Sequence, residues 1–119
     1  MAARVTTPWG WWSVLAAGPD WKVKHLVVAA GQRTSLQKHQ ERMETLTVLS
    51  PKAWLWLHDD KWLLYRGDQY VVPVDTWHRL AAGSMTEAAE FIEVQLGACS
   101  EEDVVRLEDD YGRADGPRP

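Results

Sequence analysis

The 119-residue sequence has a single cysteine, Cys99. One cysteine excludes an intrachain disulfide and a metal cage built from several thiolates. The sequence also lacks any run of basic residues, and its formal net charge at pH 7 is -4. This charge balance argues against a nucleic acid or an anionic membrane as the partner.

Long apolar runs are absent as well. No segment has the length of a signal-peptide core or of a membrane span, so we expect a soluble cytoplasmic protein. There is no glycine-rich nucleotide loop and no internal repeat. The length predicts one domain with a sizeable core, over residues 1–113. Residues 114–119 have nothing apolar to anchor them, and we expect a disordered tail there.

Turn-forming residues, by contrast, recur about every eight to twelve residues. Short runs rich in Val, Leu and Trp lie between the turns, at 21–29, 45–50, 53–57, 61–65, 69–74 and 91–96. This rhythm is typical of an all-β sandwich or barrel. Residues 53–65 predict the clearest hairpin, with two aspartates at its turn.

Two segments near the C-terminus have helical signals. Residues 83–91 predict a single turn, and residues 100–112 open with Ser100 and two acids, as a short helix would. We therefore expect short helical segments at the end of an otherwise all-β chain.

Residues 31–50 are compatible with two structures. Their apolar residues fall near helical spacing, with Ser35 as the N-cap of a helix. A strand would instead place four polar side chains on one face, those of Arg33, Ser35, Gln37 and His39. The all-β surroundings favour a strand, a bend at 40–43 and a second strand, which would bring Glu44 to the side of His39.

Six segments together carry a resemblance to a known family. They are PWG at 8–10, KVK at 22–24, GQRTSLQKH at 31–39, HRL at 78–80, FIEVQLG at 91–97 and EEDVVRLEDDYGR at 101–113. In this order and spacing they resemble the type II mannose-6-phosphate isomerase domain, a cupin. That domain often forms the C-terminal part of a bifunctional mannose-1-phosphate guanylyltransferase. The resemblance implies a free-standing cupin, which is a jelly-roll barrel or double-stranded β-helix with a metal ion in its mouth.

Matched to the metal motif of that family, the ligands fall on Gln37, His39, Glu44 and His78. Strand parity independently places Gln37 and His39 on one face. Two imidazoles, a carboxylate and an amide oxygen suit a divalent ion, with Zn²⁺ the first choice and Mn²⁺, Fe²⁺, Co²⁺ or Ni²⁺ as alternatives. The competing interpretation is that the histidines are ordinary surface or core residues without a metal.

The resemblance further implies an isomerase that interconverts an aldose and a ketose phosphate, of the mannose 6-phosphate and fructose 6-phosphate type. A metal would polarise the reacting oxygens as a Lewis acid. Arg33 and Ser35, on the ligand face, are candidates to bind phosphate or hydroxyl groups. In this interpretation Arg33→Ala weakens sugar-phosphate binding by about 2 kcal/mol or more. The further cationic candidates are Lys22, Lys24, Arg79, Arg106 and Arg113.

The general base is left open between Glu93, Lys24 and a metal-bound hydroxide. Trp77 is the tryptophan most suited to pack against the apolar face of a sugar. The other seven tryptophans are expected in the core or at a dimer interface. The apolar stretch at 7–15 would be left exposed on a lone small barrel, and we therefore expect a homodimer.

The sequence departs from the family around the metal motifs. The arginine that commonly precedes PWG is Thr7, a histidine-rich stretch is replaced by QERMET at 40–45, and Gly-Thr-Pro appears as Asp-Thr-Trp at 75–77. These changes fit altered substrate choice, or a non-catalytic cupin that binds a sugar or sugar phosphate. A third alternative is an iron-dependent dioxygenase, since two histidines and a carboxylate also suit that chemistry.

Overall fold

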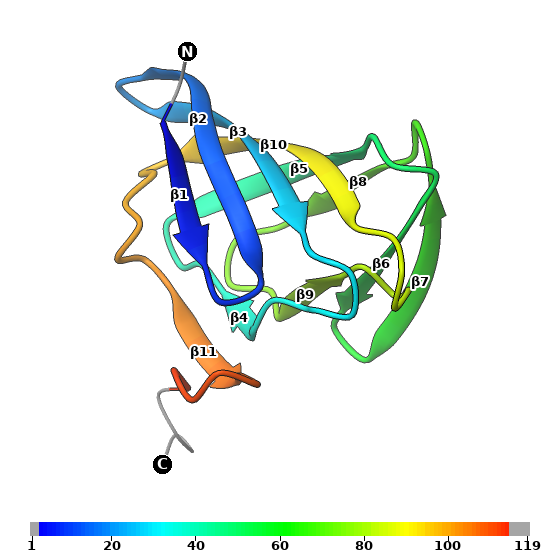
Figure 1. Cartoon of the computed structure of the whole chain (residues 1–119). Helices are drawn as coiled ribbons and strands as arrows, with labels where there is room; N and C mark the ends of the chain where they lie inside the picture. Colours follow the sequence, from blue (N-terminus) through cyan, green and yellow to red (C-terminus); the bar gives the residue numbers. More distant parts are fainter. Residues whose placement is uncertain (1–2, 115–119) are drawn as a thin grey trace.

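The computed structural model describes residues 3–114, which form eleven β-strands in two antiparallel sheets (Figure 1). The first sheet contains, in spatial order, β1 (Arg4–Thr7), β2 (Gly10–Gly18), β3 (Trp21–Val28), β10 (Ala89–Gly97), β5 (Arg42–Val48) and β8 (Gln69–Val72). The second contains β11 (Val105–Glu108), β4 (Leu36–Lys38), β9 (His78–Ala81), β6 (Lys52–Leu57) and β7 (Asp60–Tyr65). The all-β prediction is confirmed. Within the described residues there is no helix that is long and apolar enough to cross a membrane.

The strand, bend and strand predicted within residues 31–50 are also confirmed, as β4 and β5 on either side of a bend. The bend is stabilised by the carboxylate of Asp103, which accepts hydrogen bonds from the backbone N–H groups of Gln40 and Glu41. The predicted hairpin is β6 and β7, with Leu57 opposite Asp60. β4 pairs with β9, where Gln37 lies opposite His78, so this pairing fixes the register of two strands that carry candidate ligands.

The predicted helical segments near the C-terminus are wrong. At 83–91 the hydroxyl of Ser84 accepts the N–H groups of Thr86 and Glu87, but the turn goes no further because β10 begins at Ala89 between β3 and β5. At 100–112 a single turn at Ser100 is followed by β11, which pairs with β4. In both places pairing with a distant strand satisfies the backbone, and the local helical signal cannot compete with it.

The barrel interior is divided into an apolar half and a polar half. Along β3, β5 and β10 every second side chain faces inward, as the alternating burial of these strands indicates. At one end these side chains are apolar, among them Val28, Val48 and Phe91, which are fully buried or nearly so. At the other end they are Lys24, Arg42, Glu44, Glu93 and Gln95, all buried. Buried charges are costly unless they are paired, so this polar end marks the candidate site.

The two ends of the chain are only partly described. The predicted disordered tail lies outside the described residues except for Ala114, and residues 1 and 2 lie outside them too. The N-terminal stretch forms β1, the edge strand of the first sheet, and β2 beside it, with Val5 and Leu15 exposed. The homodimer stays a prediction.

Candidate metal centre

Three buried side chains from separate strands meet at the polar end of the barrel. His39 directly follows β4, Glu44 lies on β5 and His78 begins β9. One potential ligand atom from each lies within 4.8 Å of the others. The Nε2 atoms of His39 and His78 are 3.6 Å and 3.3 Å from the two carboxylate oxygens of Glu44. The structure thus brings together three of the four residues that the sequence predicted as ligands.

Hydrogen bonds to the outer nitrogens set the direction of both imidazoles. His39 Nδ1 is 2.7 Å from the carbonyl oxygen of Asp103, and His78 Nδ1 is 2.9 Å from that of Thr76. A carbonyl oxygen can only accept, so each Nδ1 carries a proton, and Nε2 is the nitrogen of each ring that can present a lone pair to a metal. Two lone pairs and a carboxylate therefore converge, and this set of acceptors suits a divalent cation.

The protonation states favour the same interpretation. Burial lowers the pKa of His39 to about 4, although the negative charge of Glu44 raises it in part. Burial would raise the pKa of Glu44, but its contact with His78 and the nearby positive charge of Arg42 hold it well below its usual range. At neutral pH the carboxylate is ionised and His39 is neutral, the forms in which these groups bind metals.

Gln37, the fourth predicted ligand, is oriented differently. It lies opposite His78 across the strands β4 and β9, at the edge of the triad. Its amide nitrogen lies 3.3 Å from His39 Nε2, while its oxygen accepts a hydrogen bond of 2.6 Å from Ser35. A half-turn of the amide would present the oxygen to the triad. Ser35 is fully buried and holds Gln37.

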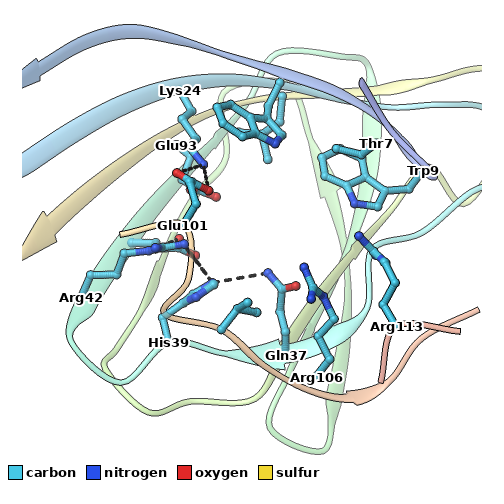
Figure 2. Close-up of a pocket in the computed structure, with 14 residues that line it drawn as sticks. Thr7, Trp9, Lys24, Gln37, His39, Arg42, Glu93, Glu101, Arg106 and Arg113 are labelled. Atoms are coloured by element: carbon cyan, nitrogen blue, oxygen red, sulfur yellow. Dashed lines mark hydrogen bonds and ion pairs between the residues drawn. The ribbon is translucent and has the colours of Figure 1, made fainter. Parts of the chain in front are cut away.

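A cavity of about 100 Å³ opens beside His39 and Glu44 (Figure 2). Its lining includes four cations, two acids and two indoles, from Lys24, Arg42, Arg106, Arg113, Glu93, Glu101, Trp9 and Trp12. Figure 2 shows Glu93, Lys24 and Glu101 on one side and the side chains of Arg106 and Arg113 on another. The cavity therefore offers an acid and cationic groups at separate places around one space.

The two candidate proton-transfer groups differ in state. Burial, followed by the charge of Glu44 and a hydrogen bond with it, raises the pKa of Glu93 to about 8. Glu93 is therefore largely protonated at neutral pH, and it accepts a hydrogen bond from Gln95 at 2.5 Å. Lys24 forms a 2.6 Å ion pair with Glu101 and lies 3.8 Å above the ring of Trp12. Lys24 is thus a paired cation, whereas Glu93 has a proton to give.

The pKa of Glu93 predicts how the stability of the metal-free protein depends on pH. Its folded-state pKa of about 8 exceeds its ordinary value of 4.5, so its effect lowers stability as pH rises between these values. The titration of His39 has the opposite effect: its folded-state pKa of about 4 is below its ordinary value of 6.5, so it raises stability as pH rises between these values. Above pH 6.5 only the Glu93 effect of the two remains. We expect a loss of about 2 kcal/mol in the free energy of unfolding between pH 6.5 and 8, since one proton is worth about 1.4 kcal/mol per pH unit.

Urea unfolding in the presence of a chelator measures this effect. Glu93→Gln should flatten the pH dependence above pH 6.5, because the amide does not titrate. Equal slopes for the wild type and Glu93→Gln would contradict the assignment.

Five of the six predicted substrate-binding residues lie outside the lining of this cavity, and the first of them is Ser35, which is buried and bonds to Gln37. The expectation that Arg33 faces the barrel interior is wrong: its half-exposed side chain forms two hydrogen bonds of 2.7 Å and 2.9 Å with Asp110. Arg79 is buried and donates to the carbonyl oxygen of Thr34. Lys22 and Trp77 likewise do not line the cavity. Lys22 contacts the backbone of Cys99 and the carboxylate of Glu101, and Trp77 contacts Lys38.

Several residues of the cavity wall were missed by the sequence analysis. Arg42 lies two residues before Glu44 and donates to it at 3.1 Å, so strand parity could have placed it on this face. Trp9 and Trp12 replace Trp77 as the indoles of the wall. Glu101 gave no local signal, because its partners lie nearly 80 residues earlier in the sequence.

Comparison with known families shows to which family the chain is related. The family model described as "Mannose-6-phosphate isomerase C-terminal" matches residues 1–109. The chain belongs to this family. The predicted resemblance is therefore confirmed, and the buried triad of His39, Glu44 and His78 is a place where this member of the mannose-6-phosphate isomerase C-terminal family could hold a metal.

Its relatives include longer proteins. The alginate biosynthesis protein AlgA of Pseudomonas aeruginosa is 39% identical over 115 residues, which are 96% of this chain and 24% of that protein. The mannose-1-phosphate guanylyltransferase ManC of Salmonella typhimurium is 33% identical over 114 residues, covering 95% of this chain and 24% of ManC. This member of the family spans about a quarter of the length of these relatives.

Solved structures with less than 25% identity share the fold. A cupin-2 domain protein from Rhodospirillum rubrum superposes with a TM-score of 0.67 at 20% identity, over 78% of this chain and 67% of the other. The capsular polysaccharide assembling protein CapF from Staphylococcus aureus has a TM-score of 0.76 at 17% identity, over 91% of this chain and 34% of the other. The domain is a cupin, as predicted.

Proposed function

We propose that this domain is a metal-dependent isomerase that interconverts an aldose and a ketose phosphate, of the mannose 6-phosphate and fructose 6-phosphate type. One observation carries the proposal. In a domain of the mannose-6-phosphate isomerase family, a buried carboxyl group, that of Glu93, lines the same cavity as His39 and Glu44 of a triad of metal-ligating type. Proton transfer next to a Lewis acid is the chemistry that this isomerisation needs.

His39, Glu44 and His78 would hold the ion, with Gln37 as a fourth ligand after its amide turns. A bound divalent ion would polarise the C1 and C2 oxygens of the sugar. The proton that leaves C2 of the aldose must return to C1, and one carboxylate can accept it from C2 and then donate it to C1. Glu93 suits this task, because with a pKa of about 8 a fraction of it is ionised near neutral pH and able to accept the C2 proton, and the acid formed can return that proton to C1.

The phosphate group needs a cationic partner in the cavity. Lys24 and Arg42 line the cavity on the side of Glu93 and Glu101. Arg106, from β11, lies on another side of the cavity, next to Arg113, which also pairs with Asp109 (Figure 2). Two guanidinium groups side by side suit a doubly charged phosphate, so we assign the phosphate to Arg106, with Arg113 beside it.

Arg106→Ala should weaken binding of mannose 6-phosphate by about 2 kcal/mol, the scale of a charge-assisted contact, with a much smaller effect on mannose. Calorimetry with both ligands measures the difference. Arg33→Ala is the matched control, since Arg33 lies outside the cavity, and its affinity should stay within about twofold of the wild type. If Arg33→Ala lost more affinity for mannose 6-phosphate than Arg106→Ala, the phosphate would be assigned to Arg33 instead.

A non-catalytic cupin that binds a sugar phosphate is the second candidate. It is favoured by the ion pair between Lys24 and Glu101, because a lysine held as a cation by a carboxylate is a poor proton-transfer group. It is also favoured by the size of the cavity, about 100 Å³, compared with roughly 300 Å³ or more for typical small-molecule sites.

An isomerase assay with mannose 6-phosphate decides between the two. We expect fructose 6-phosphate to form with Zn²⁺ or Mn²⁺, to stop with a chelator, and to resume when the ion is restored. Binding without turnover under any of these ions would favour the second candidate.

A further inference from the structure

The loop between β10 and β11 (residues 98–104, the β10–β11 loop) is tied to the candidate metal centre along its length. The N–H of Ala98 donates to the carbonyl oxygen of Glu41 at 3.1 Å, in the bend that follows His39. Arg42 donates to the carbonyl oxygen of Ser100 at 2.8 Å. In Figure 1 this loop runs along one edge of the barrel toward β11. Its docking therefore involves the same bend that carries the first histidine ligand.

Asp103 makes the most direct of these contacts. Its two carboxylate oxygens accept the N–H groups of Gln40 and Glu41, each at 2.9 Å. Its own carbonyl oxygen lies 2.7 Å from Nδ1 of His39. One residue thus holds both the bend and the imidazole that precedes it.

The neighbours of Nε2 of His39 indicate the same protonation of the ring, with the proton on Nδ1. Nε2 has the amide nitrogen of Gln37 and a guanidinium nitrogen of Arg42 as neighbours, each at 3.3 Å. The guanidinium can only donate, so Nε2 is the acceptor and Nδ1 carries the proton. His78 differs, because its Nδ1 is bound by Thr76, only two residues away on the same segment. The orientation of His39 alone depends on a segment more than 60 residues distant in the sequence.

We propose that Asp103 is a positioning residue for the metal centre: it holds His39 with Nε2 facing Glu44 and His78, so that metal affinity depends on the docked β10–β11 loop. This inference rests on the proposed metal-dependent function. A carbonyl or carboxylate that orients a ligating histidine typically contributes 10- to 100-fold to metal affinity. A purely structural role would lower the stability of the metal-free protein and leave the affinity of the folded protein unchanged.

The test is the dissociation constant for Zn²⁺ and Co²⁺, measured by competition with a chelating dye. Asp103→Ala removes the carboxylate that binds the bend, so the carbonyl of residue 103 is no longer held against His39. The affinity for both ions should fall by 10- to 100-fold. Glu102→Ala is the matched control: it removes the same charge from an exposed neighbour in the same loop, and its affinity should stay within about twofold. Affinity of folded Asp103→Ala within about twofold of the wild type overturns the inference.

A second measurement keeps the inference testable if Asp103→Ala does not fold. Long-range ¹H–¹⁵N spectra of the metal-free wild type report the tautomer of each histidine. We expect His39 to be protonated on Nδ1, and protonation on Nε2 would overturn the inference. If the wild type binds Zn²⁺ and Co²⁺ but does not isomerise mannose 6-phosphate, the proposed function is wrong and this inference is not affected. A wild type that binds neither ion would overturn both.

Discussion

Replacing His39 and His78 together by alanine should abolish stoichiometric metal binding and leave the β-rich fold intact. The two imidazoles supply the nitrogen ligands of the triad, and Glu44 alone cannot hold a transition-metal ion tightly. The fold should survive because its apolar half, around Val28, Val48 and Phe91, does not involve the triad. The lost ion should cost about 3 kcal/mol of stability at a metal concentration 100-fold above the dissociation constant.

Metal content by elemental analysis and far-ultraviolet circular dichroism measure the two parts of this result. The control is His25→Ala combined with His58→Asn, which removes two histidines outside the triad. His25 bonds to Glu90, and His58 is exposed in the turn between β6 and β7. If the two double variants bound equal amounts of metal, the triad would not be the metal-binding site.

Glu93→Gln should lower kcat by about 10²- to 10⁴-fold while KM changes little, since the amide keeps the shape of the side chain and loses its ability to transfer a proton. The residue is buried beside Glu44 and carries a raised pKa of about 8, as a proton-transfer group does. Steady-state kinetics with mannose 6-phosphate measures the effect.

Glu90→Gln is the matched control for this variant. Glu90 lies on the same strand, β10, three residues earlier, and its carboxylate bonds to His25 outside the cavity. Its kcat should stay within about twofold of the wild type. A loss of less than threefold in Glu93→Gln would exclude Glu93 as the proton-transfer group.

Strand parity predicted the ligand face well where regular strands exist. Gln37 lies within β4 and His39 directly follows it, and both reach the metal centre. Parity failed for Arg33, because this residue makes only an isolated bridge with Ala81 and β4 begins three residues later. Between them the backbone is irregular, so alternation does not carry back to Arg33. It pairs instead with Asp110, a contact that no local pattern indicates.

Contacts of the β10–β11 loop explain most of what the sequence did not reveal. Glu101 neutralises Lys22 and Lys24, and Asp103 binds the bend after His39, all across more than 60 residues of sequence. The two acids after Ser100 predicted a helix start, because capping rules consider only neighbours along the chain. The pairing of β11 with β4 brings Glu101 and Asp103 to the site, and that pairing depends on the assembled barrel.

Incubation of the protein with mannose 6-phosphate in deuterated water, followed by NMR, tests the central claim most directly. A group such as Glu93 exchanges its proton with solvent, so transfer between C2 and C1 would introduce deuterium into the sugar. The account predicts that fructose 6-phosphate forms with deuterium at C1 in the presence of Zn²⁺ or Mn²⁺, and that chelation stops both conversion and labelling. Spectra showing that mannose 6-phosphate binds to the metal-loaded protein, with neither conversion nor deuterium incorporation, would contradict it.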